Sequence, residues 1–225
     1  MSLTLAFDVY GTLINTHGVV AALSSMVGTD ANAFSTQWRD KQLEYAFRRG
    51  LMNQYVSFAQ CTEQALDFTC QHFKTPLSPS QRRELMASYQ TLPPFDDVRP
   101  ALKTLQTRGV TLCAFSNGTA EAVEQLLNHA QILEFFDDII SVDDVRTFKP
   151  SPDVYHYLMR RRDSVADNTW LISSNPFDVI GANACNIQTV WVKRSESQVF
   201  DPWGVNPTKI VSSLAGIASI NSPIT

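Results

Sequence analysis

Three short apolar runs that each end abruptly in polar residues limit the possible fold of this chain most strongly. The runs, with the residue that follows each, are Leu3–Phe7 before Asp8, Val110–Phe115 before Ser116, and Trp170–Ile172 before Ser173. Two further runs, at residues 139–142 and 189–192, have the same β-branched character. Runs of this length and composition predict the buried strands of a parallel sheet.

Helical patterns lie between these runs, for example at residues 120–127 and 153–161. Strands that alternate with helices predict an α/β fold with a doubly wound, parallel-sheet, Rossmann-like core. In such sheets, ligands bind beyond the carboxyl ends of the strands. The polar residues that follow the apolar runs all fall at that edge.

One region interrupts the alternation, because residues 16–92 contain helical patterns and no convincing strand. Its apolar and aromatic residues recur at helical spacing, and a further helix is expected to begin at Ser80, before Pro93 and Pro94 close the region. We therefore predict a core domain of residues 1–15 and 93–225, with residues 16–92 inserted as an all-helical cap domain. An insertion directly after the Asp8 loop would overhang the carboxyl edge of the sheet.

Charge and cysteine content narrow the classes of partner. The chain has 18 basic and 22 acidic residues, and its one short basic cluster is Arg160–Arg162, so nucleic acid is not an expected partner. Four widely spaced cysteines predict reduced, buried thiols. No signal peptide is evident, and no apolar stretch approaches the ~20 residues of a membrane span. These features predict a cytoplasmic protein that does not contact a membrane.

Asp8 begins a loop that can carry chemistry. Gly11 permits a tight turn, and Thr12 offers a hydroxyl and an N–H group to a bound anion. A single aspartate after a strand is more often a turn or cap residue. Three other polar clusters at the same sheet edge make a catalytic carboxylate the better interpretation.

Each of the other clusters has an ordinary structural alternative. The second cluster, Ser116 to Thr119, precedes a helix and could bind an anion, or Thr119 or Ser116 could simply cap that helix. Lys149 could lower the pKa of Asp8 and hold it ionised, or could be a surface lysine. The fourth cluster, Ser173 to Asp178, ends in a carboxylate that could align a water molecule or hold Lys149 in place.

Together these clusters resemble the four motifs of the haloacid dehalogenase superfamily, in the same order along residues 5–214. The finer resemblance is to the (S)-2-haloacid dehalogenases. The segment 38–45 resembles the cap helix that carries the substrate-binding arginine of that family, here Arg39. Val154 and Tyr155, which follow Lys149, also match.

The resemblance implies a mechanism and a role for each matching residue. Asp8 would attack the α-carbon of a short (S)-2-haloacid, expel halide with inversion and form an aspartyl ester that water hydrolyses to the (R)-2-hydroxyacid. The implied catalytic residues are Asp8, Lys149, Ser173, Asn175 and Asp178. The implied substrate-binding residues are Tyr10, Thr12, Arg39, Leu43, Phe58, Ser116, Asn117, Tyr155 and Phe177. Without the resemblance, the apolar members of this set would be assigned to core packing and Arg39 to a solvated helix face.

Two positions depart from the family pattern. Phe177 stands where many members have tryptophan, and Pro176 beside it is unusual. Both changes bear on the shape of the pocket, and so on the preferred halogen and chain length.

Tyr10 distinguishes a dehalogenase from the phosphatases of the same superfamily. Phosphatases carry a second aspartate two residues after the nucleophile, which protonates the alkoxide leaving group. A phenol with a pKa near ~10 is a poor proton donor at neutral pH, whereas halide leaves without protonation. A haloacid also has less negative charge than a phosphate dianion, so no metal and no cofactor are expected.

Two other hypotheses remain open at this stage. The same nucleophile could act on a phosphate ester or another activated 2-substituted carboxylic acid, in which case turnover of an aryl phosphate would depend on magnesium. Alternatively, the chain could bind small acids without catalysis, and Asp8→Asn would then leave ligand affinity unchanged. The resemblance also implies that a homodimer can form.

Overall fold

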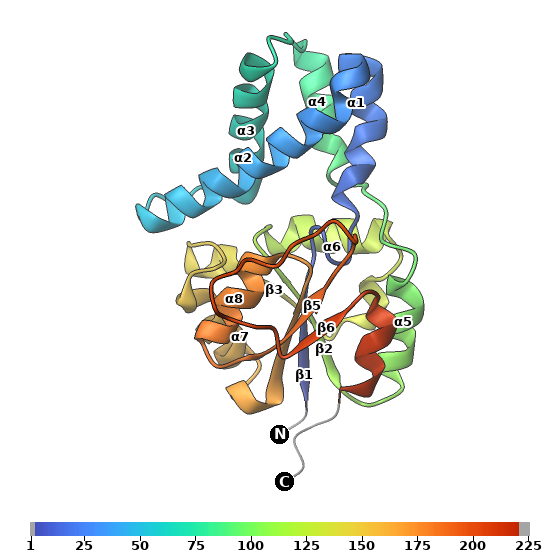
Figure 1. Ribbon diagram of the computed structural model, residues 1–225, viewed down its shortest axis with the longest axis vertical. Helices are drawn as coiled ribbons and strands as arrows, with labels where there is room; N and C mark the ends of the chain where they lie inside the picture. Colours follow the sequence, from blue (N-terminus) through green and yellow to red (C-terminus); the bar gives the residue numbers. More distant parts are fainter. Residues whose placement is uncertain (1–2, 221–225) are drawn as a thin grey trace.

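The computed structural model describes residues 3–220, which form a six-stranded sheet between two layers of helices with a helical bundle above one sheet edge (Figure 1). All strands are parallel, and their order is β3-β2-β1-β4-β5-β6. The strands are β1 Thr4–Asp8, β2 Thr111–Ser116, β3 Asp138–Ser141, β4 Thr169–Ser173, β5 Gln188–Val192 and β6 Lys209–Val211. The predicted doubly wound α/β core is therefore confirmed.

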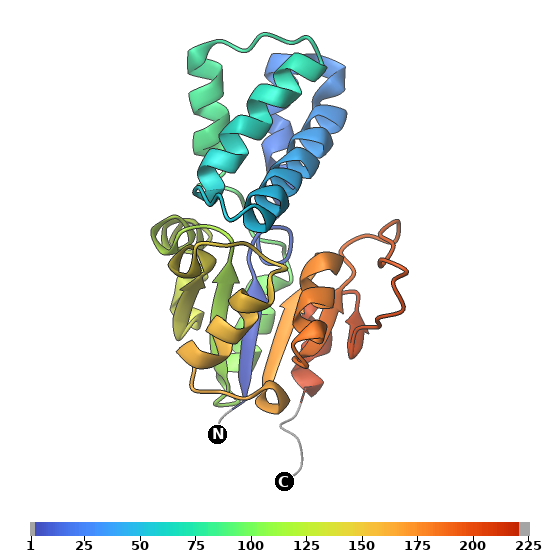
Figure 2. The ribbon, with the colours of Figure 1, turned by 90° about the vertical axis from the view of Figure 1, so that its left-hand side faces the viewer.

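Alternate side chains of the central strands pack against different helix layers. Leu5 and Phe7 join a core that includes α5 (Val98–Gln106), α6 (Ala120–His129) and the 3-10 helix η6 (Leu214–Ser219). Ala6 joins a second core with α7 (Pro152–Arg161). The neighbouring α8 (Pro176–Ala184) covers the same side of the sheet (Figure 2). Burial on both faces explains why these strands appear in the sequence as continuous apolar runs.

Each predicted strand differs from the observed one by a single residue at one or both ends, and one strand was missed. Val142 belongs to a 3-10 turn after β3 and not to the strand itself. The edge strand β6 was not predicted, because its three residues are too few to form an apolar run and Ile210 is exposed. All four cysteines are free and buried, as the sequence predicts.

Four helices occupy the region between β1 and α5 and form the cap above the carboxyl edge of the sheet (Figures 1 and 2). They are α1 Val19–Val27, α2 Ala31–Leu51, α3 Phe58–His72 and α4 Pro79–Ser88. The long α2 packs on α1 and α3, and α4 packs on α1. Trp38 of α2 is fully buried among them, with its indole N–H donating to the carbonyl of Thr62 at 2.8 Å.

The start of α4 corrects a detail of the sequence prediction. The helix begins at Pro79, and Ser78 is its N-cap, with Gln81 completing a capping box. The predicted start at Ser80 was therefore one residue late, since proline is well suited to the first helical position. The domain bounds at residues 15/16 and 92/93 stay a prediction.

Candidate active site

Asp8 is the last residue of β1 and lies at the centre of the carboxyl edge of the sheet. The neighbouring strands β2 and β4 end at Ser116 and Ser173, so the sheet register brings the three residues to one edge. Gly11 has a φ of +87°, a conformation that glycine adopts without steric cost, and it turns the chain back after Asp8.

Three side chains hold the Asp8 carboxylate, which is buried with 6% of its surface exposed. The Thr12 hydroxyl and the Asn175 amide both donate to Oδ2, each at 2.7 Å. The Lys149 ammonium donates to Oδ1 at 3.0 Å. A carboxylate held in this way keeps one orientation, because moving it would break charge-assisted hydrogen bonds.

Lys149 lies between two carboxylates and is itself 1% exposed. Besides Asp8, its ammonium donates to Asp178 Oδ2 and to the carbonyl of Phe115, each at 2.9 Å. Burial alone would lower the pKa of Lys149, but the two carboxylates raise it above its ordinary value. Lys149 is therefore a permanent cation at neutral pH, with all three of its N–H groups used.

Asp178 is fully buried and supports Lys149 from the other side. Burial raises the pKa of the Asp178 carboxyl, the Lys149 ammonium opposes that shift, and the Asp8 carboxylate adds to it. The Tyr155 hydroxyl donates to Asp178 Oδ1 at 2.8 Å. A Cβ atom on Gly181 would lie 2.5 Å from this hydroxyl, so the glycine is required for Tyr155 to reach Asp178.

Ser116, Asn117 and Ser173 shape the backbone around the nucleophile. Ser116 accepts from the N–H of Gly118, and Ser173 accepts from the N–H of Asn175. Asn117 Oδ1 accepts from the N–H of Lys149 at 3.0 Å and so fixes the loop that carries the cation. Thr119 is the N-cap of α6, and its hydroxyl accepts from the N–H of Ala122. The helix-capping role that was considered for this cluster therefore applies to Thr119.

The structure gives Thr12 and Tyr155 partners other than the predicted substrate. Both side chains are fully buried. The Thr12 hydroxyl donates to Asp8 and accepts from the N–H of Ser174 at 2.8 Å, and Tyr155 donates to Asp178. The sequence pattern placed them in the site but did not reveal that they hold the carboxylates.

The cap contacts the nucleophile loop through Arg39 of α2. Its Nη2 lies 3.4 Å from the carbonyl of Tyr10, which also accepts from Asn175 at 3.1 Å. Arg39 is thus linked to the Asp8 carboxylate through two groups, the Tyr10 carbonyl and the Asn175 amide.

Aromatic rings from cap and core meet beside this contact. The ring centroids of Tyr10 and Phe58 are 5.9 Å apart, and those of Phe47 and Phe177 are 5.0 Å apart. Leu43 lies one helical turn after Arg39 and is partly exposed. Burial raises the pKa of Tyr10 to about 12, although the nearby Arg39 opposes this shift.

Two residues of the site were missed by the sequence analysis. Gln42 is fully buried, accepts from Arg39 Nη1 at 2.6 Å and donates to the Thr62 hydroxyl. Arg194 donates to the carbonyl of Thr12 at 3.2 Å and to Asp97 at 2.7 Å. Gln42 could have been found from its i+3 spacing to Arg39, and Arg194 from its position just after β5.

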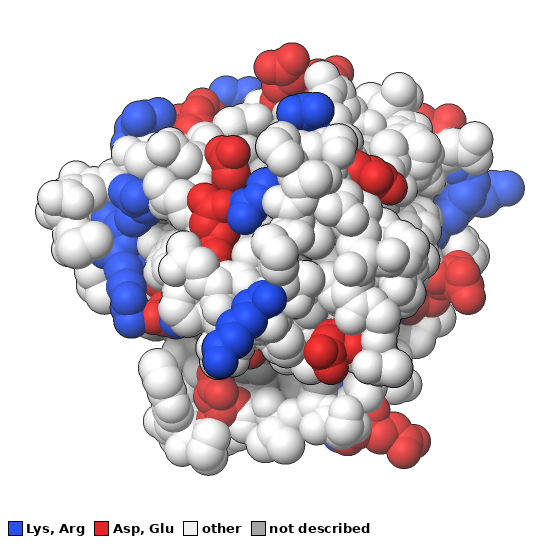
Figure 3. All heavy atoms as spheres, turned by 90° about the horizontal axis from the view of Figure 1, so that it is seen from above, with Lys and Arg blue, Asp and Glu red and all other residues white. Residues whose placement is uncertain are grey.

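No group of three or more potential metal ligands occurs among residues 3–220. In the same part of the chain, no helix is both long and apolar enough to cross a membrane. On the face seen from above, acidic and basic side chains are interspersed (Figure 3).

Comparison with known proteins places this arrangement in a family. The model of the haloacid dehalogenase-like hydrolases matches residues 5–192. The (S)-2-haloacid dehalogenase of Pseudomonas sp. strain YL is 36% identical over 216 residues, which cover 96% of this chain and 93% of that protein. Haloacetate dehalogenase H-2 of Moraxella sp. strain B is also 36% identical, with 96% of both chains covered.

A solved structure agrees with the sequence relatives. The L-2-haloacid dehalogenase of Xanthobacter autotrophicus, with chloropropionic acid covalently bound, matches with a TM-score of 0.88 and 26% identity over 97% of both chains. The match includes both the sheet and the cap. The chain therefore belongs to the haloacid dehalogenase-like hydrolase family.

Proposed function

We propose that this chain is an (S)-2-haloacid dehalogenase that converts short-chain (S)-2-haloacids to (R)-2-hydroxyacids through an ester on Asp8. The observation that carries the proposal is the Asp8 carboxylate held by Thr12, Asn175 and Lys149, with a phenol in place of an acid two residues later. Relatives that are named (S)-2-haloacid dehalogenase support the same substrate class.

In the first step, an Asp8 oxygen attacks the α-carbon and halide leaves from the opposite side. The negative charge of Asp8 is consumed as the ester forms. Halide needs no proton donor, which agrees with Tyr10, whose pKa of about 12 makes it a weaker acid than free tyrosine.

In the second step, water attacks the carbonyl carbon of the ester and negative charge develops on an Asp8 oxygen. Lys149 and Asn175 already donate to the two carboxylate oxygens and are placed to stabilise that charge. Arg39 supplies positive charge from the cap for the substrate carboxylate or the leaving halide. Tyr10, Phe58 and Phe177 supply apolar surface around them.

Tyr10, in place of a second aspartate, favours a dehalogenase over a magnesium-dependent phosphatase, and the charge around Asp8 agrees with this. Lys149 lies within 3.0 Å of Asp8 Oδ1 and 2.9 Å of Asp178 Oδ2. Its single positive charge thus lies between the two carboxylates and offsets one of their two negative charges. A phosphate dianion would need additional positive charge at Asp8.

Halide release from the separate enantiomers of 2-chloropropionate tests the proposed function. We expect chloride from the S enantiomer only, at the same rate with EDTA or with added magnesium, because the reaction requires no metal. Chloride measured by ion chromatography reports the outcome. Release of phosphate from an aryl phosphate in the presence of magnesium, with no chloride from any 2-haloacid, would favour the phosphatase alternative.

Gln42 is expected to position Arg39 for the substrate. Replacing it with methionine removes the acceptor of Arg39 Nη1 and the donor to Thr62. We expect kcat/KM to fall about tenfold to hundredfold, mainly through a higher KM, since a lost buried hydrogen bond costs roughly 1–3 kcal/mol.

Two further variants separate this role from general damage to the cap. Thr62→Val removes the other partner of Gln42 and should change KM in the same direction, by a smaller factor. The control is Gln71→Met on the exposed surface of α3, which should leave both constants unchanged. An unchanged KM in Gln42→Met would rule out the positioning role.

Three predictions accompany the proposed function. The assignment of residues 16–92 to a cap domain that overhangs the Asp8 site stays a prediction. The cytoplasmic location stays a prediction that rests on the cysteine content. The homodimer stays a prediction from the family resemblance.

A further inference from the structure

A hollow of about 180 Å³ lies at the base of the cap, between the 3-10 helix η1 (Thr16–Gly18), the first half of α2 and the end of α4. We call it the Ser35–Tyr89 hollow after two of the residues that line it. It is larger than one water molecule needs, and it shares only Arg39 with the site described above.

Two largely buried residues present their hydroxyl groups to this hollow without a protein partner. Ser35 is 6% exposed and Tyr89 is 9% exposed. Within residues 3–220, neither hydroxyl makes a hydrogen bond, and neither oxygen is among the buried unpaired atoms, so both are open to the hollow and available to a ligand. Burial also raises the pKa of Tyr89 to about 12, so its hydroxyl keeps its proton and can donate.

The charges around the hollow select the ligand that these hydroxyls would bind. Arg39 contributes a guanidinium with five N–H groups, of which one donates to Gln42 and another makes the 3.4 Å contact with Tyr10. Asp40 lies at the exposed rim and repels anions, and this repulsion is stronger for a dianion than for a monoanion. A cation, two neutral donors and one opposing carboxylate suit a monoanion that accepts several hydrogen bonds.

We propose that the Ser35–Tyr89 hollow is a second binding site for a short-chain carboxylate, separate from the Asp8 site. The carboxylate would accept hydrogen bonds from the Ser35 and Tyr89 hydroxyls and from Arg39. Arg39 would then contact carboxylates on two sides, so a ligand in the hollow would affect the residue that faces the substrate. The binding proposal holds whether or not Asp8 acts on haloacids.

Crystals of the intact protein soaked with 2-bromo-2-methylpropionate would test the proposal directly. This acid resists attack at its crowded α-carbon, and its bromine can be located by anomalous scattering. We expect a bromine peak in the hollow, with the carboxylate within hydrogen-bond distance of Ser35 Oγ and Tyr89 Oη. A parallel soak with lactate distinguishes a site for haloacids from one for hydroxyacids.

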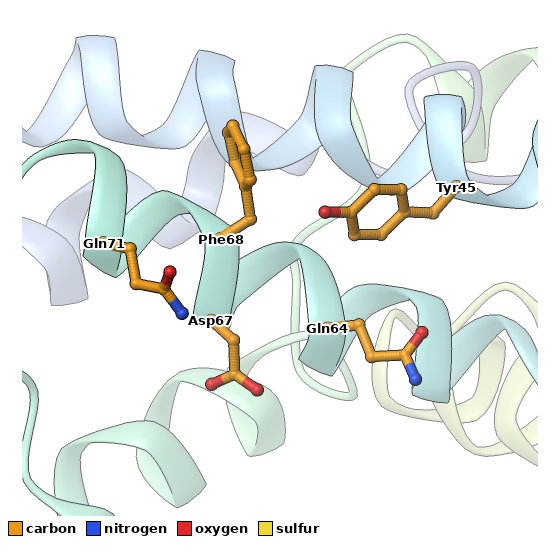
Figure 4. Close-up of a pocket in the computed structure, with 5 residues that line it drawn as sticks. All are labelled: Tyr45, Gln64, Asp67, Phe68 and Gln71. Carbon is orange, nitrogen blue, oxygen red and sulfur yellow. The ribbon is translucent and has the colours of Figure 1, made fainter.

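The solution experiment is calorimetric titration of the intact protein with propionate. We expect two binding events per chain, and the double variant Ser35→Ala/Tyr89→Phe should weaken one of them at least tenfold. The matched control is Ser24→Ala/Tyr45→Phe, which changes the same residue types elsewhere on the cap. Tyr45 lines a different hollow, together with Phe68 and Asp67 of α3 (Figure 4).

The outcomes separate this proposal from the proposed function. An empty hollow in crystals whose Asp8 site contains the bromoacid, or two unaltered binding events in the double variant, would overturn the second site. Binding in the hollow that depends on the two hydroxyls, without halide release from any haloacid, would support the second site and reject the dehalogenase.

Discussion

Replacing Asp8 with asparagine is expected to lower chloride release from (S)-2-chloropropionate by at least about 10⁴-fold, the scale seen when a catalytic nucleophile is removed. The amide keeps the size of the carboxylate but is a much weaker nucleophile. It also places an NH₂ group toward one of the donors Lys149, Thr12 and Asn175. Ion chromatography of released chloride measures the loss.

Isotope labelling shows whether Asp8 itself forms the ester. In ¹⁸O water, the hydroxyacid from a single turnover should contain unlabelled oxygen, because its oxygen comes from Asp8, and the label should appear in the peptide that contains Asp8. Label in the first-turnover product would show that water attacks the substrate directly. Asp153→Asn, an exposed change on α7, serves as the control for activity.

Replacing Lys149 with methionine is expected to affect both activity and stability. Chloride release should fall by at least about 10²- to 10³-fold, since a preorganised donor to the reacting carboxylate is lost. The free energy of unfolding should fall by about 3–5 kcal/mol, because Asp8 and Asp178 remain buried without their shared cation. Urea unfolding at neutral pH measures the second effect, with Lys103→Met on the surface of α5 as the control.

The pH dependence of this loss follows from the raised pKa of Asp178. A carboxyl group whose pKa is higher in the folded than in the unfolded protein costs stability at high pH, and this cost disappears as pH falls through the folded value. The deficit of Lys149→Met should therefore shrink on mild acidification. Adding Asp178→Asn should recover stability at neutral pH without recovering activity. Equal deficits at all pH values would contradict this account.

The core of the fold could be predicted because its strands are buried on both faces. Leu5, Phe7 and their neighbours form apolar runs that a parallel sheet requires, and the polar residue after each run marks the carboxyl edge. The edge strand β6 has no such signal, since Ile210 faces outward and only Val211 is buried. A short strand that is buried on one face only contains too few apolar residues to be recognised in the sequence.

The sequence predicted which residues belong to the site better than it predicted the contacts between them. Asp8 and Lys149 were placed together because their strands and loops share one sheet edge. Whether a buried hydroxyl binds substrate or holds a carboxylate depends on atomic positions that no spacing encodes, as Thr12 and Tyr155 show. Gln42 was overlooked because a glutamine in a helix is usually solvated, and only tertiary packing buries it.

Two of the three groups that hold Asp8 are far from it along the chain. Lys149 lies 141 residues after Asp8, and Asn175 lies 167 residues after it. Arg194, which donates to the Thr12 carbonyl, lies 182 residues after Thr12. During synthesis the nucleophile therefore leaves the ribosome first and its supports leave last. A nascent chain can complete the cap helices, whose contacts are local, well before the reactive carboxylate is ordered. Catalytic competence is thus acquired only after Arg194 has left the ribosome, and chains that stop before it are inactive however well their early part has folded.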